Sequence, residues 1–173
     1  MEIYWTQTKE PQSQTAHGLL ERVLEERYGI TSPELLLGEQ GKPYLPEGPE
    51  FSISHSHGIA AVAVGAQPLG LDVEELRPYH ARVPERIMSP SEYRWFLGRG
   101  ELKRDFFTLW TLKESYYKYL GTGLRGFPND TEFYFDGSWH LRGKELWFYT
   151  RLEKKLLMTV CCHEQEEIRI HRI

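Results

Sequence analysis

The chain has 173 residues, of which 40% are hydrophobic and 27% are charged, with a net charge of −4 at neutral pH. This composition is typical of an ordinary globular protein, and the negative charge argues against a nucleic-acid partner. No apolar run approaches membrane-spanning length, and the first residues lack the layout of a secretion signal, so we expect a cytoplasmic protein without membrane association.

The first part of the chain is predicted to contain one helix and three strands. A stripe of apolar residues predicts a helix over Gln12–Tyr28, which Gly29 ends. Glycine and proline around Lys42 predict a loop over residues 38–48. Alternating apolar residues predict strands at 2–6, 51–54 and 59–64.

The second part is predicted to begin after Pro68, which divides the chain into ranges 1–68 and 69–173. A strand at 69–73 precedes two short helices within 78–100 and a longer helix over Phe106–Gly123. Because this order lacks regular strand–helix–strand alternation, it indicates an α+β fold rather than a doubly wound parallel sheet. The remaining predicted strands are 131–135, 146–152, 156–162 and 168–171.

The helix predicted over Phe106–Gly123 carries an acid between lysines. Glu114 and Lys118 are four residues apart, so they meet on one face of the helix, and Lys113 lies at the edge of that face. A ladder of surface ion pairs would give the same pattern, and this segment alone does not separate that interpretation from a functional one.

Two more acids follow the apolar run that begins at Leu69. Asp72 and Glu74 are two residues apart, and on a strand they point to the same side. They either form a solvated strand end or share a cation. Together with Glu114 they would form an oxygen-ligand site suited to Mg²⁺, and the neighbouring lysines suit phosphate oxygens. The pattern therefore indicates a phosphoryl or pyrophosphate substrate.

Four motifs in order resemble those of a known family. They are Gly-Lys-Pro at 41–43, a strand ending in Ser54-His55, GLDVE at 70–74, and F-x-x-x-W-x-x-K-E-x-x-x-K at 106–118. The last two are similar to the paired signature of the 4′-phosphopantetheinyl transferases, above all the larger, surfactin-synthetase-activating (Sfp-type) branch. The motifs cover residues 41–123.

The resemblance implies a fold of two pseudo-symmetric halves, each with a small antiparallel sheet packed on a helix. It implies Mg²⁺-dependent transfer of the 4′-phosphopantetheine group of coenzyme A to a serine of an apo acyl or peptidyl carrier protein, releasing adenosine 3′,5′-bisphosphate. The implied metal ligands are Asp72, Glu74 and Glu114. Glu114 is the first choice of general base, Glu74 the second, and Lys118 would act on the phosphates. The implied coenzyme A ligands are Lys42, Ser54, His55, Lys113 and Lys118.

One departure concerns the first helix. Members of the larger branch carry basic residues there that grip the nucleotide phosphates, whereas residues 15–18 of this chain are Thr-Ala-His-Gly. The N-terminal half is also short. Lys42 and His55 are therefore expected to bind the nucleotide phosphates alone, and His57 is left without a role. Two other interpretations stay open: a non-catalytic carrier-protein or nucleotide-binding protein of the same fold, and a metal-dependent phosphohydrolase.

A basic stretch, Arg77–Arg104, is expected to dock the carrier protein. It contains seven basic and three acidic residues, and carrier proteins of this family's reactions are typically acidic. The alternative is that its aromatic residues pack inward and its arginines are only solvated. We expect a monomer. The predicted apolar anchors of the docking surface are Tyr79, Met88, Tyr93, Trp95 and Phe96.

Overall fold

A computed structural model of the chain describes residues 1–123 and 129–173. The helices are α1 (Gln12–Tyr28), α2 (Val83–Ile87), α3 (Pro90–Gly98) and α4 (Lys103–Leu120). None of the helices in these two ranges is both long and apolar enough to cross a membrane. The strands are β1 (Glu2–Gln7), β2 (Leu36–Leu37), β3 (Pro43–Tyr44), β4 (Glu50–Ser56), β5 (Ile59–Gly65), β6 (Leu69–Glu75), β7 (Phe133–Phe135), β8 (Trp139–Leu141), β9 (Trp147–Glu153), β10 (Leu156–Cys162) and β11 (Arg169–Arg172).

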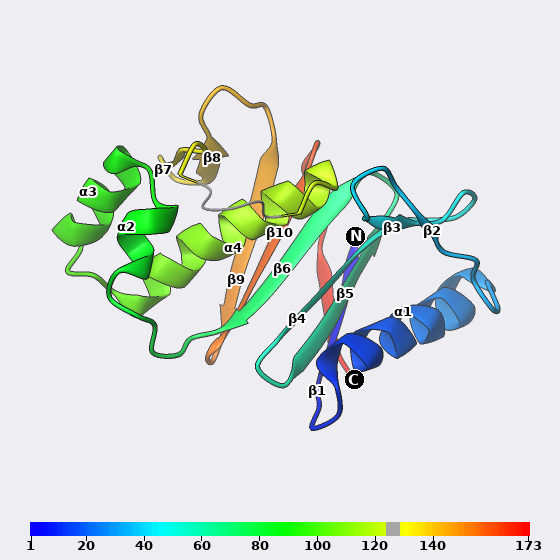
Figure 1. Cartoon of the computed structure of the whole chain (residues 1–173). Coiled ribbons are helices and arrows are strands. Elements are labelled where there is room, and N and C mark those ends of the chain that lie inside the picture. Colours follow the sequence, from blue (N-terminus) through cyan, green and yellow to red (C-terminus); the bar gives the residue numbers. More distant parts are fainter. Residues whose placement is uncertain (124–128) are drawn as a thin grey trace.

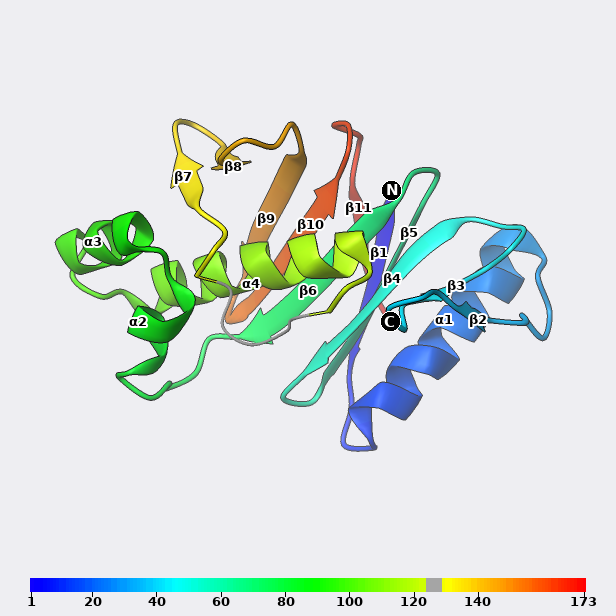
Figure 2. The same cartoon turned by 45° about the horizontal axis from the view of Figure 1, so that its top comes forward.

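The two larger sheets lie next to each other, and each is covered by one long helix. The first sheet has the order β11-β1-β5-β4 and the second the order β6-β10-β9. All strand pairs in them are antiparallel except β1 with β11. Helix α1 covers one sheet and α4 the other, and α2 and α3 lie near the N-terminal end of α4 (Figures 1 and 2).

Three apolar clusters fill the spaces between these layers. One lies between α1 and the first sheet and includes Leu20 and Val62. A second joins the two sheets, with Ile3 on one side and Met158 on the other. The third packs α4 against the second sheet and against α2 and α3. Because apolar side chains on both faces of each larger sheet are buried, the layers form one continuous α-β-β-α body.

The α+β prediction is confirmed. The predicted helix at 12–28 and strand at 156–162 match the structure at both ends, and Gly29 ends α1 with a left-handed backbone (φ 68°). Helix α4 begins at Lys103, earlier than predicted. The strands β2, β3 and β8, which are two or three residues long, were not predicted. The division after residue 68 stays a prediction, and β11 pairs with β1 of the first range.

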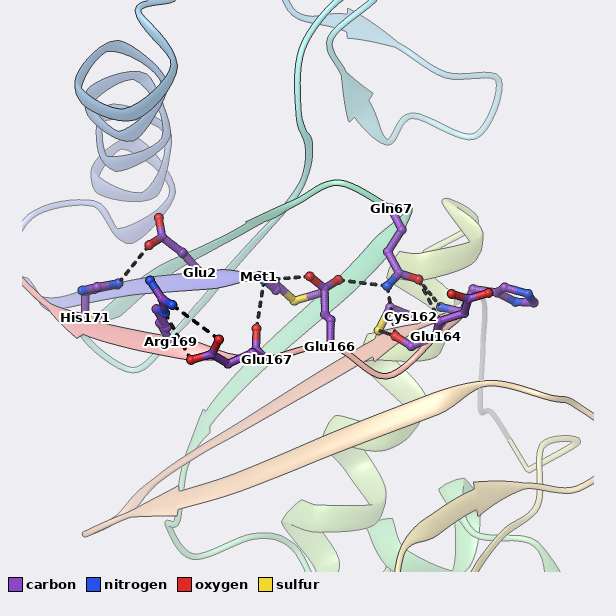
Figure 3. A network of polar contacts seen from close by, with 10 residues as sticks. Met1, Glu2, Gln67, Cys162, Glu164, Glu166, Glu167, Arg169 and His171 are labelled. Carbon is purple, nitrogen blue, oxygen red and sulfur yellow. Dashed lines mark hydrogen bonds and ion pairs between the residues drawn. The ribbon is translucent and has the colours of Figure 1, made fainter.

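A polar network holds the segment before β11 against the start of β1. The Met1 amine donates to Glu166, and the amide of Gln67 donates to the same carboxylate (Figure 3). Gln67 also accepts from the backbone of His163 and Glu164. These contacts connect the β5–β6 turn to the chain between β10 and β11, and so they tie the two larger sheets together at one edge.

Strand β6 and helix α4 approach each other most closely at Gly70. A Cβ atom at this position would overlap the Ser115 carbonyl oxygen and the Tyr119 amide nitrogen. Both of these are backbone atoms of α4, so no side-chain rotation could relieve the overlap. Glycine is therefore required here by packing. The contact fixes how β6 lies along α4.

We predict that Gly70→Ala lowers the free energy of unfolding by about 3 kcal/mol or more, because β6 and α4 must separate to accept a methyl group. Gly18→Ala is the matched control. Gly18 lies within α1, and a methyl group added there would meet no atom within 4 Å, so alanine should stabilise the protein by about 0.5–1 kcal/mol. Urea unfolding of both variants tests the prediction, and equal stability of Gly70→Ala and the parent would contradict it.

Candidate active site

The alternation of side chains along β6 sets up the site. Leu69, Leu71 and Val73 belong to the core between the two sheets. Since successive residues of a strand point to opposite faces, Asp72 and Glu74 share the side of Gly70, which faces α4. The two acids that follow the apolar run are thus directed toward the helix that carries Glu114 and Lys118.

A row of serines on β4 completes the surroundings of the acids. The hydroxyl of Ser52 accepts from the Leu71 amide, and that of Ser54 accepts from the Val73 amide. Ser56 donates to Glu74 Oε2 at 2.5 Å. Strands β4 and β6 belong to different sheets, so serine side chains replace a backbone ladder where the sheets meet. The sheet junction therefore runs along the edge of the acidic site.

Lys118 connects α4 to this junction. Its ammonium lies 2.7 Å from Asp72 Oδ1 and 2.8 Å from the Ser54 hydroxyl. Ser54 also donates to Asp72 Oδ1. The other carboxylate oxygen of Asp72, Oδ2, is buried and has no hydrogen-bond partner. A buried carboxylate oxygen normally finds a partner, so this atom points to a ligand that would satisfy it.

The surroundings of Glu114 raise the pKa of its carboxyl. Burial raises the pKa of this carboxyl to about 7; the negative charge of Asp72 adds to the effect, Lys118 opposes it, and Glu74 adds to it again. Burial likewise raises the pKa of Glu74, whereas the hydrogen bond from Ser56 lowers it. The three acids thus interact electrostatically from two elements far apart in sequence.

The donor set fits a hard cation such as Mg²⁺, because it consists of carboxylates and includes the unpartnered Asp72 Oδ2. The side chains are not gathered into a finished cage, however. Among the described residues, no three His, Cys, Asp or Glu side chains are close enough to hold a metal ion. Asp72 Oδ1 is already paired with Lys118, and Glu74 Oε2 already accepts a hydrogen bond from Ser56. The predicted metal ligands are therefore neighbours that would need to turn toward an ion.

Lys113 was predicted to contact phosphate, but its side chain is buried away from the acidic site. Its side chain is 1% exposed, and its amine lies 2.9 Å from Glu92 Oε2 and donates to the Thr131 carbonyl oxygen. Glu92 in turn accepts from the backbone amides of Ser89 and Phe133. Lys113 is thus used to hold α4 to α3 and to the start of β7, and it offers no surface to a substrate.

A pocket of about 180 Å³ adjoins the acidic site. Lys118 reaches from one to the other, since it lines the pocket and binds Asp72. Lys42 also lines the pocket; its amine donates to the Leu69 carbonyl oxygen, and burial lowers its pKa. Gly121, at the C-terminal end of α4, approaches the Lys42 side chain. The remaining lining residues are Gln40, Gly41, Pro43, Phe51, Ser52, Ile53 and Gly123.

The two histidines of the β4–β5 region differ in their contacts. His55 is exposed, and its side chain makes no hydrogen bond or ion pair within the described residues. The Nδ1 atom of His57 accepts from Arg77 Nε and lies 2.9 Å from the Ser56 hydroxyl. His57 therefore joins the turn after β4 to the segment after β6, a connection that sequence reasoning did not find.

The basic segment 77–104 is folded partly into the core. Met88 and Phe96 are 2% and 0% exposed, so they pack inward and are not the surface anchors that the sequence predicted. Tyr79, Tyr93 and Trp95 are only partly buried. The exposed part of the segment includes Arg82 on the approach to α2 and Arg86 within it.

Sequence reasoning missed the roles of Ser52, Ser56 and Glu92. The serines alternate along β4 at the spacing of one strand face, a signal that could have placed Ser56 beside the site. Glu92 stands three residues after Ser89, the pattern of a helix capping box, and the structure shows that box at the start of α3. Its pairing with Lys113 has no sequence signal.

Comparisons with known proteins show the family of the chain. The chain belongs to the 4′-phosphopantetheinyl transferase superfamily, whose family model matches residues 68–168. It is 34% identical over 112 residues to a 4′-phosphopantetheinyl transferase of Bacillus subtilis, covering 61% of this chain and 50% of that protein. To the 4′-phosphopantetheinyl transferase gsp of Aneurinibacillus migulanus it is 31% identical over 110 residues, covering 61% of this chain and 46% of that one. The chain thus spans about half the length of these relatives.

Among solved structures, the chain is similar to the holo-(acyl-carrier-protein) synthase of Thermotoga maritima. The match has 27% sequence identity and a TM-score of 0.49, and covers 57% of this chain and 64% of the other.

We predict that Lys113→Met lowers the free energy of unfolding by about 3–5 kcal/mol, because it leaves Glu92 charged and buried without its cation. Lys118→Met should cost less, since the Lys118 side chain is 26% exposed, compared with 1% for Lys113, and Ser54 still donates to Asp72. Chemical unfolding of both variants provides the measurement. A Lys113→Met protein as stable as the parent would show that the buried pair does not hold α4 in place.

We predict that the stability of the fold depends on pH through Glu114. A carboxyl with an unfolded pKa near 4.5 and a folded pKa of about 7 stabilises the fold at low pH, and this contribution is lost as pH rises through that window. Metal-free Glu114→Gln should therefore gain stability relative to the parent between pH 4.5 and 7, by about 1–3 kcal/mol. Glu21→Gln, an exposed acid of α1, should show no such trend. A constant difference for Glu114→Gln across this range would refute the assignment.

Proposed function

We propose that the protein transfers the 4′-phosphopantetheine group of coenzyme A to a serine of an apo acyl or peptidyl carrier protein. The observation that carries the proposal is the position of Lys118, which lines the pocket beside Lys42 and also binds Asp72. A substrate with a nucleotide in the pocket would bring its pyrophosphate to this lysine and to the acids. Membership of the transferase superfamily supports the same reaction.

The nucleotide end of coenzyme A is assigned to the 180 Å³ pocket. Lys42 is the cation there, partly buried and held by the Leu69 carbonyl oxygen. Its desolvated charge would attract a phosphate more strongly than an exposed lysine would. Helix α1 contributes no residue to the pocket lining among the described residues. Lys42 is therefore proposed as the main contact of the adenosine bisphosphate, with exposed His55 as a second.

Asp72, Glu74 and Glu114 are proposed to hold a Mg²⁺ ion, with the unpartnered Oδ2 of Asp72 as its first ligand. When bound, the ion would neutralise charge on the pyrophosphate and help to orient it. Lys118 would then contact a phosphate oxygen as well as Asp72, because its side chain is 26% exposed. Burial and the like charges of the other acids raise the pKa of Glu114, and the cation would balance these charges.

The reaction needs a base for the serine hydroxyl. Glu114 is proposed for this role, directly or through a water molecule, and Glu74 is the second candidate, because burial raises the pKa of both carboxyls, that of Glu114 to about 7. The serine oxygen would form a bond to the β-phosphorus as the bond to the bridging oxygen breaks. Adenosine 3′,5′-bisphosphate would leave, with Lys118 offsetting the charge on its phosphate.

The carrier protein is proposed to dock on the segment Arg77–Arg104, which follows β6 directly. Its seven basic residues would attract an acidic partner. Tyr79, Tyr93 and Trp95 are the partly buried aromatic residues of this segment that remain as apolar contacts.

The assay that tests this function uses the protein with coenzyme A, Mg²⁺ and apo carrier proteins of fatty-acid, polyketide and peptide synthases. Mass spectrometry should show one phosphopantetheine mass on the carrier and release of adenosine 3′,5′-bisphosphate. Cleavage of coenzyme A without modification of any carrier would indicate a phosphohydrolase. Binding of either partner without any product would indicate a non-catalytic relative.

We predict that Asp72→Ala and Glu114→Ala each remove most of the transfer activity, at least about 100-fold, because each deletes a proposed metal ligand. Glu21→Ala, which removes an exposed acid of α1, is the control and should keep the parental rate. The readout is the initial rate of carrier modification with Mg²⁺ limiting. Near-parental rates in both site variants would place the metal site elsewhere.

We predict that reversing Arg82 and Arg86 to glutamate raises the KM for the carrier protein about tenfold at low salt, with little change in the KM for coenzyme A. The effect should shrink as salt increases, since charge attraction at a surface is screened. If the KM for coenzyme A rises instead, these arginines bind phosphate and do not belong to the docking surface.

A further inference from the structure

A second cleft, of about 350 Å³, lies where the two larger sheets end together. Its apolar lining comes from Trp5, Ile59 and Leu156, on β1, β5 and β10. Both views show the β4–β5 turn and the β9–β10 turn at the same end of the molecule as the chain that leaves β6 (Figures 1 and 2). The positively charged residues that line the cleft are Lys154, Lys155 and Arg172, and His57 lines it as well.

The two lysines of this cleft are available to a partner. Lys154 and Lys155 are exposed in the β9–β10 turn, and neither forms an ion pair within the described part of the chain. Arg172 lies 5.0 Å from the centre of the Trp5 ring and donates to Gln7. Two acids, Glu75 and Glu153, also line the cleft. The lysine turn, defined as Lys154 and Lys155, is thus an exposed positive feature of the cleft.

The lysine turn is continuous with the segment proposed to dock the carrier. The carbonyl oxygen of Lys155 accepts from the Leu76 amide, one residue before Arg77. On the other side Arg77 donates to His57, which also lines the cleft. Arg77 Nη2 lies 3.9 Å from Glu74 of the candidate site. A partner that reaches Glu74 from the Arg77 side would therefore lie beside the lysine turn as well.

We propose that the lysine turn and the cleft beside it form a second contact surface for the acidic carrier protein, next to Arg77. This inference rests on the proposed transferase function. An acidic stretch of the carrier would face Lys154 and Lys155, and an apolar side chain next to it would contact Trp5 and Leu156. Positive charge in the lysine turn as well as in the segment Arg77–Arg104 would help to orient the carrier serine toward the acids.

The test compares Lys154→Glu and Lys155→Glu with Lys144→Glu. Lys144 is also an exposed turn lysine, but it precedes β9, so the length of that strand, roughly 20 Å, separates it from the lysine turn. All three variants carry the same change in charge. For each, the Kd of labelled apo acyl carrier protein, the KM for carrier and for coenzyme A, and urea unfolding are measured at about 0.05 M and about 0.5 M salt.

Each lysine-turn variant should weaken carrier binding about fivefold at low salt and less at high salt, with an unchanged KM for coenzyme A and unchanged stability. Lys144→Glu should bind like the parent. Equal effects of all three variants on carrier binding, or no effect of the two lysine-turn variants, would overturn the inference. Transfer by the parent protein in the same experiment would still uphold the proposed function. A parent that neither binds nor modifies any carrier would overturn both.

Discussion

The contact between β6 and α4 at Gly70 is the constraint on which the rest of the site depends. The strand backbone lies so close to the Ser115 and Tyr119 backbone that only hydrogen fits at this position. This contact sets the position of β6 along the helix. Two and four residues further along the strand, Asp72 and Glu74 consequently face the turns of α4 that carry Glu114 and Lys118. A shift of one residue would turn both acids into the core between the sheets.

Serine hydroxyls hold the other side of the site. Ser52 and Ser54 accept from the backbone amides of β6, and Ser56 donates to Glu74, so the acidic strand is fixed to the edge of the first sheet. On the helix side, Lys113 and Glu92 form a buried ion pair that anchors α4 from behind. Lys113 and Lys118, the two lysines of the signature motif, therefore have different roles. One is structural and buried, and the other, Lys118, remains partly exposed at the site.

The sequence was sufficient for the parts of the structure that follow from local periodicity. The helix at 12–28, the α+β class and the shared side of Asp72 and Glu74 all depend on spacing along one element. What it could not provide depends on packing between distant elements. Lys113 and Lys118 look equivalent in the motif, and only the position of Glu92 on another helix separates them. The inward packing of Met88 and Phe96 likewise depends on how α2 and α3 fold onto α4.

The central claim is that Asp72, Glu74 and Glu114 act together as a cation site for a pyrophosphate substrate. Electron paramagnetic resonance with Mn²⁺ as a probe tests it most directly, by counting bound ions in the presence of coenzyme A. The account predicts one ion per chain for the parent, and loss of that ion in both Asp72→Asn and Glu114→Gln. Parental Mn²⁺ binding in these two variants would contradict it.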